Sequence, residues 1–186
     1  VDCTFCGHIN TTGDVLLAAQ TIIGLADGVD VPSILALVDT PNFHGPEGSV
    51  IGFADCGLNT EPTPNELASI AISAADGVKS IMGWEPRVAF LSFSTDGSGS
   101  SASVENTKAA IQIMHERRPD IPADGEFQLD TAIDPKVAAK KVKRPSDVAG
   151  KANVLVFPDL DAANIAVKLI QRFAGGQAFG HNLYGF

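Results

Sequence analysis

Basic side chains are scarce in this sequence. Its 186 residues include 13 lysines and arginines against 22 aspartates and glutamates, for a formal net charge of −9. A protein that binds nucleic acid through its general surface needs positive charge to neutralise phosphates, so the composition argues against that class. The sequence also lacks an uninterrupted apolar run of about 18 residues, which a membrane-spanning helix requires. We therefore expect neither nucleic acid nor a membrane as a partner.

Cysteine is also rare, being limited to Cys3, Cys6 and Cys56. A sparse, odd set does not provide a disulfide framework. Cys3 and Cys6 have CxxC spacing, but a zinc site would need two further ligands, and the four histidines are scattered. We therefore expect reduced cysteines in a cytoplasmic protein, and no metal site. Because the sequence starts at Val1 without a methionine, we also expect the chain to be part of a longer one.

The residues that are present have a globular composition, with 45% apolar and 19% charged. Short apolar runs predict strands at 33–38, 50–54, 88–93, 127–130 and 152–157. Helical spacing and capping residues predict helices at 15–23, 62–82, 104–117, 135–141 and 161–173. Strands and helices alternate from residue 50 onward. This order predicts an α/β fold, with a layered, mostly parallel sheet and helices on both faces.

Ligands of parallel α/β sheets bind beyond the carboxyl ends of the strands. Two predicted loops lie there, residues 158–164 and residues 94–103, which we call the Ser/Gly loop. A strand, a hydroxyl-rich loop and a helix N-terminus suit an anion, although a solvated loop with a helix cap has the same composition. The loop is neither a Walker motif nor GxGxxG. A basic run at 140–144 is either a solvated helix end or a contact for a phosphorylated ligand.

Five segments, in order, resemble the phosphate acetyltransferase (phosphotransacetylase) and phosphate butyryltransferase family. They are residues 8–15, 53–63, 85–95, 124–130 and 150–160, the last followed by Ala163-Asn164-Ile165. The last segment, Gly-Lys-Ala-Asn-Val-Leu-Val-Phe-Pro-Asp-Leu, is the most specific. The resemblance covers essentially the whole chain.

The resemblance implies reversible transfer of an acetyl group between coenzyme A and inorganic phosphate. It implies coenzyme A and an acyl phosphate as substrates, no cofactor beyond coenzyme A as substrate, no metal, and a homodimer. Family members fold as two α/β domains with the site in the cleft between them. By that map, residues 1–29 are a remnant of the first, outer domain, residues 30–177 are the inserted second domain, and residues 178–186 are a return segment.

The resemblance also implies roles for individual residues. Hydroxyls of the Ser/Gly loop would contact the acyl phosphate or the pantetheine arm, Asn164 would face the same cleft, and two threonines would contact phosphate from the outer domain. Asn164 could instead be a buried hydrogen-bonding residue in the first turn of its helix. The hydroxyl-bearing residues are Thr11, Thr12, Ser94, Thr95, Ser98 and Ser100.

Two departures from the family pattern limit these expectations. Leu17 stands where the family has an arginine, and leucine cannot hold phosphate by paired hydrogen bonds. The family's Ser-Arg-Gly motif and the acidic residue after it are expected beyond Phe186, so we expect the isolated chain to be inactive. The alternative is a non-catalytic regulatory domain that senses acetyl-CoA, like the related domain at the end of long malic enzymes.

Overall fold

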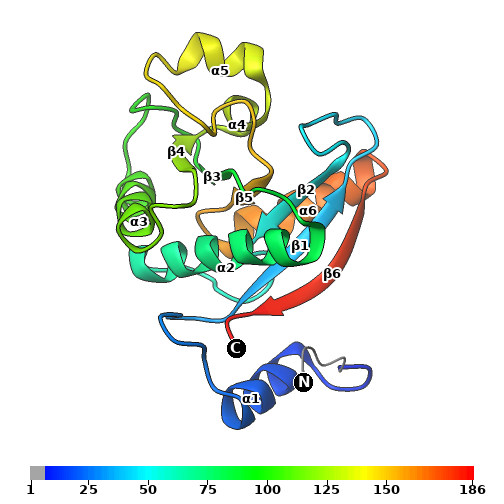
Figure 1. Ribbon diagram of the computed structural model, residues 1–186. Coiled ribbons are helices and arrows are strands. Elements are labelled where there is room, and N and C mark those ends of the chain that lie inside the picture. Colours follow the sequence, from blue (N-terminus) through cyan, green and yellow to red (C-terminus); the bar gives the residue numbers. More distant parts are fainter. Residues whose placement is uncertain (1–6) are drawn as a thin grey trace.

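The computed structural model describes residues 7–186, so the CxxC pair of Cys3 and Cys6 lies outside the described residues. Six strands form one sheet in the order β4-β3-β5-β2-β1-β6 (Figure 1). The strands are β1 (Ser33–Asp39), β2 (Val50–Ala54), β3 (Val88–Leu91), β4 (Ala123–Phe127), β5 (Val154–Val156) and β6 (Gln177–Tyr184). The pairs β2–β5, β5–β3 and β3–β4 are parallel, whereas β1 pairs antiparallel with β2 and β6. The predicted mostly parallel sheet is therefore confirmed.

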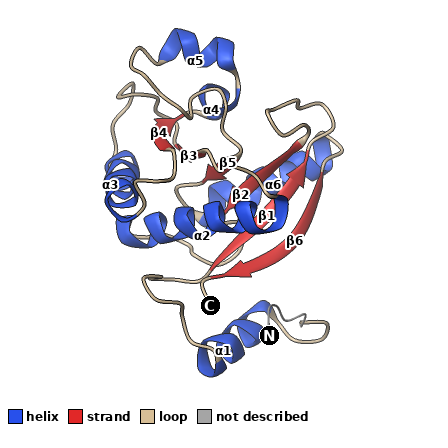
Figure 2. Cartoon of the chain, viewed as in Figure 1, coloured by secondary structure: helices blue, strands red, loops and turns tan. Residues whose placement is uncertain are grey.

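Helices cover both faces of this sheet, as predicted (Figure 2). They are α1 (Thr12–Ile22), α2 (Pro64–Met82), α3 (Ala102–Arg117), α4 (Leu129–Ile133), α5 (Pro135–Lys141) and α6 (Leu160–Phe173). One buried cluster joins α2 and α3 to the sheet, and a second cluster joins α4 and α6 to the opposite face. Helix α1 buries none of its residues and lies below the sheet in the view of Figure 1. No helix within residues 7–186 combines the length and apolarity needed to cross a bilayer.

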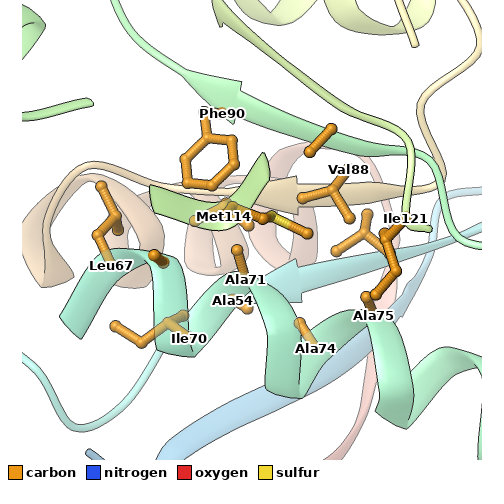
Figure 3. Packing of buried hydrophobic residues seen from close by; sticks show 14 of the residues in the cluster. Ala54, Leu67, Ile70, Ala71, Ala74, Ala75, Val88, Phe90, Met114 and Ile121 are labelled. Carbon is orange, nitrogen blue, oxygen red and sulfur yellow. The ribbon is translucent and has the colours of Figure 1, made fainter. Parts of the chain in front are cut away.

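The larger core lies between α2 and the sheet (Figure 3). Successive strand side chains point to opposite faces, so Val88 and Phe90 of β3 face α2. Small residues of α2, among them Ala71 and Ala74, let the helix approach the strands closely, and Met114 of α3 packs into the same cluster. This packing fixes the strand ends from which the loops project.

Local signals explain the bounds of α2. The Thr63 hydroxyl accepts a hydrogen bond from Glu66 N, and the Glu66 carboxylate accepts one from Thr63 N, which together form a capping box. Gly83 ends the helix in the left-handed conformation at φ +67°. The predicted stop of this helix is confirmed, and its first residue is Pro64, two residues after the predicted start at 62.

Two of the predicted strands are wrong in extent. Residues 127–130 are not a strand: β4 ends at Phe127, and α4 begins at Leu129. The polar side chains of Asp124 and Glu126 hid β4, because their hydrogen bonds are made within the protein. Strand β3 stops at Leu91, and Phe93 is 62% exposed rather than buried.

Strand β6 was not predicted. It pairs with β1 across the edge of the sheet, with Ala178 opposite Val38 and Leu183 opposite Ile34. Its glycine at position 180 has φ +81°, and the pairing register shifts between Leu35 and Leu37. Most of the expected return segment thus adds a strand to the sheet.

Candidate functional site

The carboxyl ends of four parallel strands lie along one edge of the sheet. There β2 leads into Asp55, β5 into Phe157, β3 into the Ser/Gly loop and β4 into Gln128. These connections are drawn in tan in Figure 2. In an open α/β sheet this edge is the expected place for a ligand.

The Ser/Gly loop is held by its first two hydroxyls. Ser94 is buried, and its Oγ donates to Glu126 Oε1 at 2.7 Å and accepts from Gly99 N at 2.9 Å. Thr95 is also buried, and its Oγ1 accepts from Gln128 N at 2.8 Å. These two hydroxyls therefore support the backbone of the loop in the structure.

The other two predicted loop residues face outward. Ser98 and Ser100 are exposed, and Ser98 Oγ accepts from Thr95 N at 2.9 Å. The loop thus has an internally bonded base and an exposed rim. A ligand at this edge would meet the rim hydroxyls and the backbone first.

Glu126 is the charged centre beneath the loop. Only 2% of the residue is exposed, and its carboxylate accepts hydrogen bonds from Ser94 Oγ and, at 2.9 Å, from Gly97 N. Burial raises the pKa of this carboxyl, but these hydrogen bonds outweigh burial and hold the pKa below its usual range. Glu126 is therefore ionised at neutral pH, and its carboxylate accepts the hydrogen bonds that hold the loop in place.

The basic run at 140–144 makes ion pairs within the protein. Lys141 Nζ lies 2.8 Å from Asp130 Oδ2, and Arg144 pairs with Asp96 and Asp124. Two of the four charges in this run are therefore directed at the molecule's own carboxylates, and Lys143 Nζ donates to the carbonyl oxygen of Ala139.

A pocket of about 240 Å³ lies between α6, β1, β6 and the start of α1. It brings Thr12 and Asn164, two predicted site residues from distant parts of the sequence, into one cavity. The remaining lining residues are Ala36, Cys56, Gly57, Val167, Lys168, Gln171, Ala178 and Gly180.

Lys168 is a pocket residue that the sequence analysis missed. Its Nζ donates to Asn164 Oδ1 at 2.6 Å, and Asn164 Nδ2 donates to the carbonyl oxygen of Cys56 at 3.5 Å. The two side chains are four residues apart on α6 and so share a face of the helix. That spacing was the available signal. Lys168 supplies a positive charge to the pocket of an acidic protein, which suits an anionic ligand.

Cys56 contributes a neutral thiol to the pocket wall. Burial, reinforced by the negative charge of Asp55, raises the pKa of this thiol to about 11. The group therefore stays protonated near neutral pH, and it is not set up to act as a nucleophile.

The remaining residues of the first helix are placed as follows. The Thr11 hydroxyl caps α1 by accepting a hydrogen bond from Asp14 N at 3.2 Å. Leu17 is 65% exposed and is not among the described residues that line the pocket. Within residues 7–186, no three histidine, cysteine or acidic side chains gather as metal ligands would.

Comparisons with known proteins all indicate the same family. The profile of the phosphate acetyl/butaryl transferase family matches residues 1–186. The chain is 46% identical to the phosphate acetyltransferase of Clostridium acetobutylicum over 186 residues, which cover 100% of this chain and 56% of that protein. It is 44% identical to that of Treponema pallidum, again over 100% of this chain and 56% of the relative.

Solved structures agree. A phosphotransacetylase from Streptococcus pyogenes superposes with a TM-score of 0.88 at 38% identity, over 96% of this chain and 53% of that one. A phosphotransacetylase from Staphylococcus aureus gives a TM-score of 0.84 at 38% identity, over 96% and 52%. The chain spans a little over half the length of the two curated relatives named above. With a family profile matched from end to end, the chain belongs to the phosphate acetyl/butaryl transferase family.

Proposed function

We propose that this chain forms part of a phosphate acetyltransferase, which moves an acetyl group reversibly between coenzyme A and inorganic phosphate. The observation that carries the proposal is the pocket at which Thr12, Asn164 and Lys168 meet. It belongs to a chain that is 46% identical along its whole length to a protein named phosphate acetyltransferase.

The reaction needs positioning and charge neutralisation more than covalent chemistry. The sulfur of coenzyme A attacks the acetyl carbonyl carbon, a C–S bond forms, and the C–O bond to phosphate breaks. Phosphate leaves with the electron pair, and the thiol proton passes to a base. In this proposal Lys168 faces the phosphate charge, while Thr12 and Asn164 orient its oxygens by hydrogen bonds.

The Ser/Gly loop would hold the second reactant at the same edge of the sheet. Its exposed hydroxyls, Ser98 and Ser100, are the proposed contacts for the acyl phosphate or the pantetheine arm, and Ser94 and Thr95 support them from below. Thr11, as the cap of α1, places Thr12 at the pocket. The Ser-Arg-Gly motif and the thiol base are proposed to come from sequence that this chain does not contain.

The remaining features of the proposal follow the family. Coenzyme A serves as substrate with no further cofactor, the assembly is a homodimer, and the protein works in the cytoplasm. Residues 1–29 would be a remnant of the outer domain and residues 30–177 the inserted one, with residues 178–186, most of which lie in β6 of the same sheet, as the segment that returns toward the outer domain. A homologous sensor of acetyl-CoA is the alternative, favoured by Leu17 in the arginine position.

Calorimetric titration of the purified chain tests this function. Coenzyme A, acetyl phosphate and acetyl-CoA are titrated separately, with inorganic phosphate as a fourth ligand. Binding of coenzyme A together with acetyl phosphate supports the transferase. Binding of acetyl-CoA without either phosphate ligand would replace it by the sensor, and no binding of any ligand at millimolar concentration would overturn both.

A further inference from the structure

Arg144 joins two segments that are far apart in the sequence. Its Nε donates to Asp96 Oδ1 of the Ser/Gly loop at 2.8 Å. Its two terminal nitrogens donate to both oxygens of Asp124 in β4, each at 2.8 Å. One guanidinium group thus bridges the loop to the strand beside it.

The geometry of this bridge suits arginine in particular. A planar guanidinium can bind one carboxylate with two parallel hydrogen bonds and still reach a second acceptor, which a lysine ammonium cannot do in a fixed plane. The Arg144 Cζ also lies 5.8 Å from the centre of the Phe127 ring, which supports the plane of the group. Ser146 Oγ also donates to Asp124 Oδ2.

The loop residue that Arg144 holds has an unfavourable backbone conformation. Asp96 has φ +50°, the one left-handed non-glycine residue among those described, and Gly97 follows at φ +84°. Few side chains adopt this region without support, although aspartate tolerates it better than most. The Arg144 ion pair is therefore placed where the loop most needs an external tie.

The turn that Arg144 holds also affects the exposed rim of the Ser/Gly loop. Gly97 N points to Glu126 and Ser98 Oγ to Thr95 N, so the position of Ser98 depends on the turn at 96–97. We infer that Arg144 is a positioning residue, which holds the Ser/Gly loop in the conformation that binds coenzyme A or the acyl phosphate. This inference rests on the proposed function.

The chain contains a matched control. Arg118 also bridges two carboxylates, with Nη1 2.8 Å from Asp76 Oδ2 and Nη2 2.9 Å from Asp120 Oδ2. Its side chain is 30% exposed and that of Arg144 is 40% exposed, but its two carboxylate partners are 52% and 62% exposed, against 29% and 14% for those of Arg144. R144Q should therefore lower the stability more than R118Q, and binding and exchange are compared under conditions in which both variants are folded. Arg118 contacts neither the Ser/Gly loop nor β4 through these pairs.

The test compares R144Q, R144K and R118Q with the unaltered chain. Coenzyme A affinity is measured by calorimetry, and amide hydrogen exchange at Gly97 and Gly99 is measured by NMR. We expect R144Q to bind coenzyme A about tenfold more weakly. A loss of this size follows if only about a tenth of the R144Q molecules have the loop conformation that binds the ligand. Exchange at the two glycines should accelerate, R144K should restore only part of the affinity, and R118Q should change neither quantity.

The outcomes separate this inference from the proposed function. If the unaltered chain binds no coenzyme A or acetyl phosphate, the proposed function fails, and the inference fails with it. Two outcomes would leave the proposed function standing and overturn the role of Arg144. In the first, R144Q binds coenzyme A as tightly as the unaltered chain does. In the second, R118Q weakens binding as much as R144Q does. Unchanged exchange at Gly97 and Gly99 in R144Q would overturn it independently.

Discussion

At the scale of single residues, the proposed recognition of phosphate in the pocket depends on Lys168. Replacing it by glutamine keeps a polar side chain and removes the charge. A hydrogen bond to a charged group contributes about 1.5–3 kcal/mol, so K168Q should bind inorganic phosphate at least about tenfold more weakly. Calorimetry or phosphorus NMR measures this. K140Q, which removes an exposed charge on α5, is the control, and an equal loss there would show a long-range charge effect instead.

Glu126 gives the Ser/Gly loop a dependence on pH. Its pKa in the folded protein lies below the ordinary value of 4.5, so its ionised form stabilises the fold above that pH. This stabilisation is lost as the pH falls from about 4.5 through the folded-state pKa. In E126Q the free energy of unfolding should therefore decline less steeply on acidification than in the unaltered chain. Urea titrations at a series of pH values test this, and parallel declines would contradict it.

At the scale of elements, Gly150 determines how the α4–α5 segment docks on the sheet. Its φ is +73°, and a Cβ added there would lie 2.6 Å from the Cα of Pro135 at the start of α5. G150A should therefore lower the free energy of unfolding by about 2–4 kcal/mol, from the left-handed backbone and the overpacking together.

Gly83 provides the control for this change. It has φ +67° at the end of α2, but an added Cβ there meets nothing within 4 Å. G83A should lower the free energy of unfolding by only about 1–2 kcal/mol, because alanine is disfavoured in the left-handed backbone conformation but meets no neighbour. Urea unfolding of both variants measures the difference, and equal losses would show that the close approach of Pro135 carries no energy.

Elements with local signals could be predicted from the sequence. The Thr63–Glu66 capping box and Gly83 specify α2, and the apolar run at 50–54 specifies β2. Strand β6 could not be predicted, because its glycine and asparagine are poor strand formers and its paired residues in β1 lie 138 to 151 positions away in the sequence. Strand β4 was hidden by polar side chains whose partners are supplied by tertiary contacts.

Part of the candidate site, like part of the fold, could be predicted from the sequence. The Ser/Gly loop follows from its composition, and Asn164 from the resemblance. The spacing of Asn164 and Lys168 places both on one face of α6, but the sequence does not show that this face closes a pocket with β1 and β6. Arg144 stands in an ordinary basic run, and its partners lie 48 and 20 residues away in the sequence.

At the scale of the whole molecule, the charge balance and the site work against each other. The net charge of −9 repels anions at a distance, so the proposed binding of phosphate would depend on a few local groups. Two such groups are present, the pocket around Lys168 and the rim of the Ser/Gly loop. The central claim is that the two together receive coenzyme A and acyl phosphate.

An amide NMR titration of the 19.3 kDa chain with coenzyme A and then acetyl phosphate tests that claim most directly. We predict saturable shifts that concentrate at Gly97–Ser100 and at the pocket residues Thr12, Asn164 and Lys168. Helix α5, which contributes no residue to the pocket or to the Ser/Gly loop, should stay unchanged. Saturable shifts elsewhere, with the loop and the pocket unaffected, or no shifts at millimolar ligand, would contradict the account.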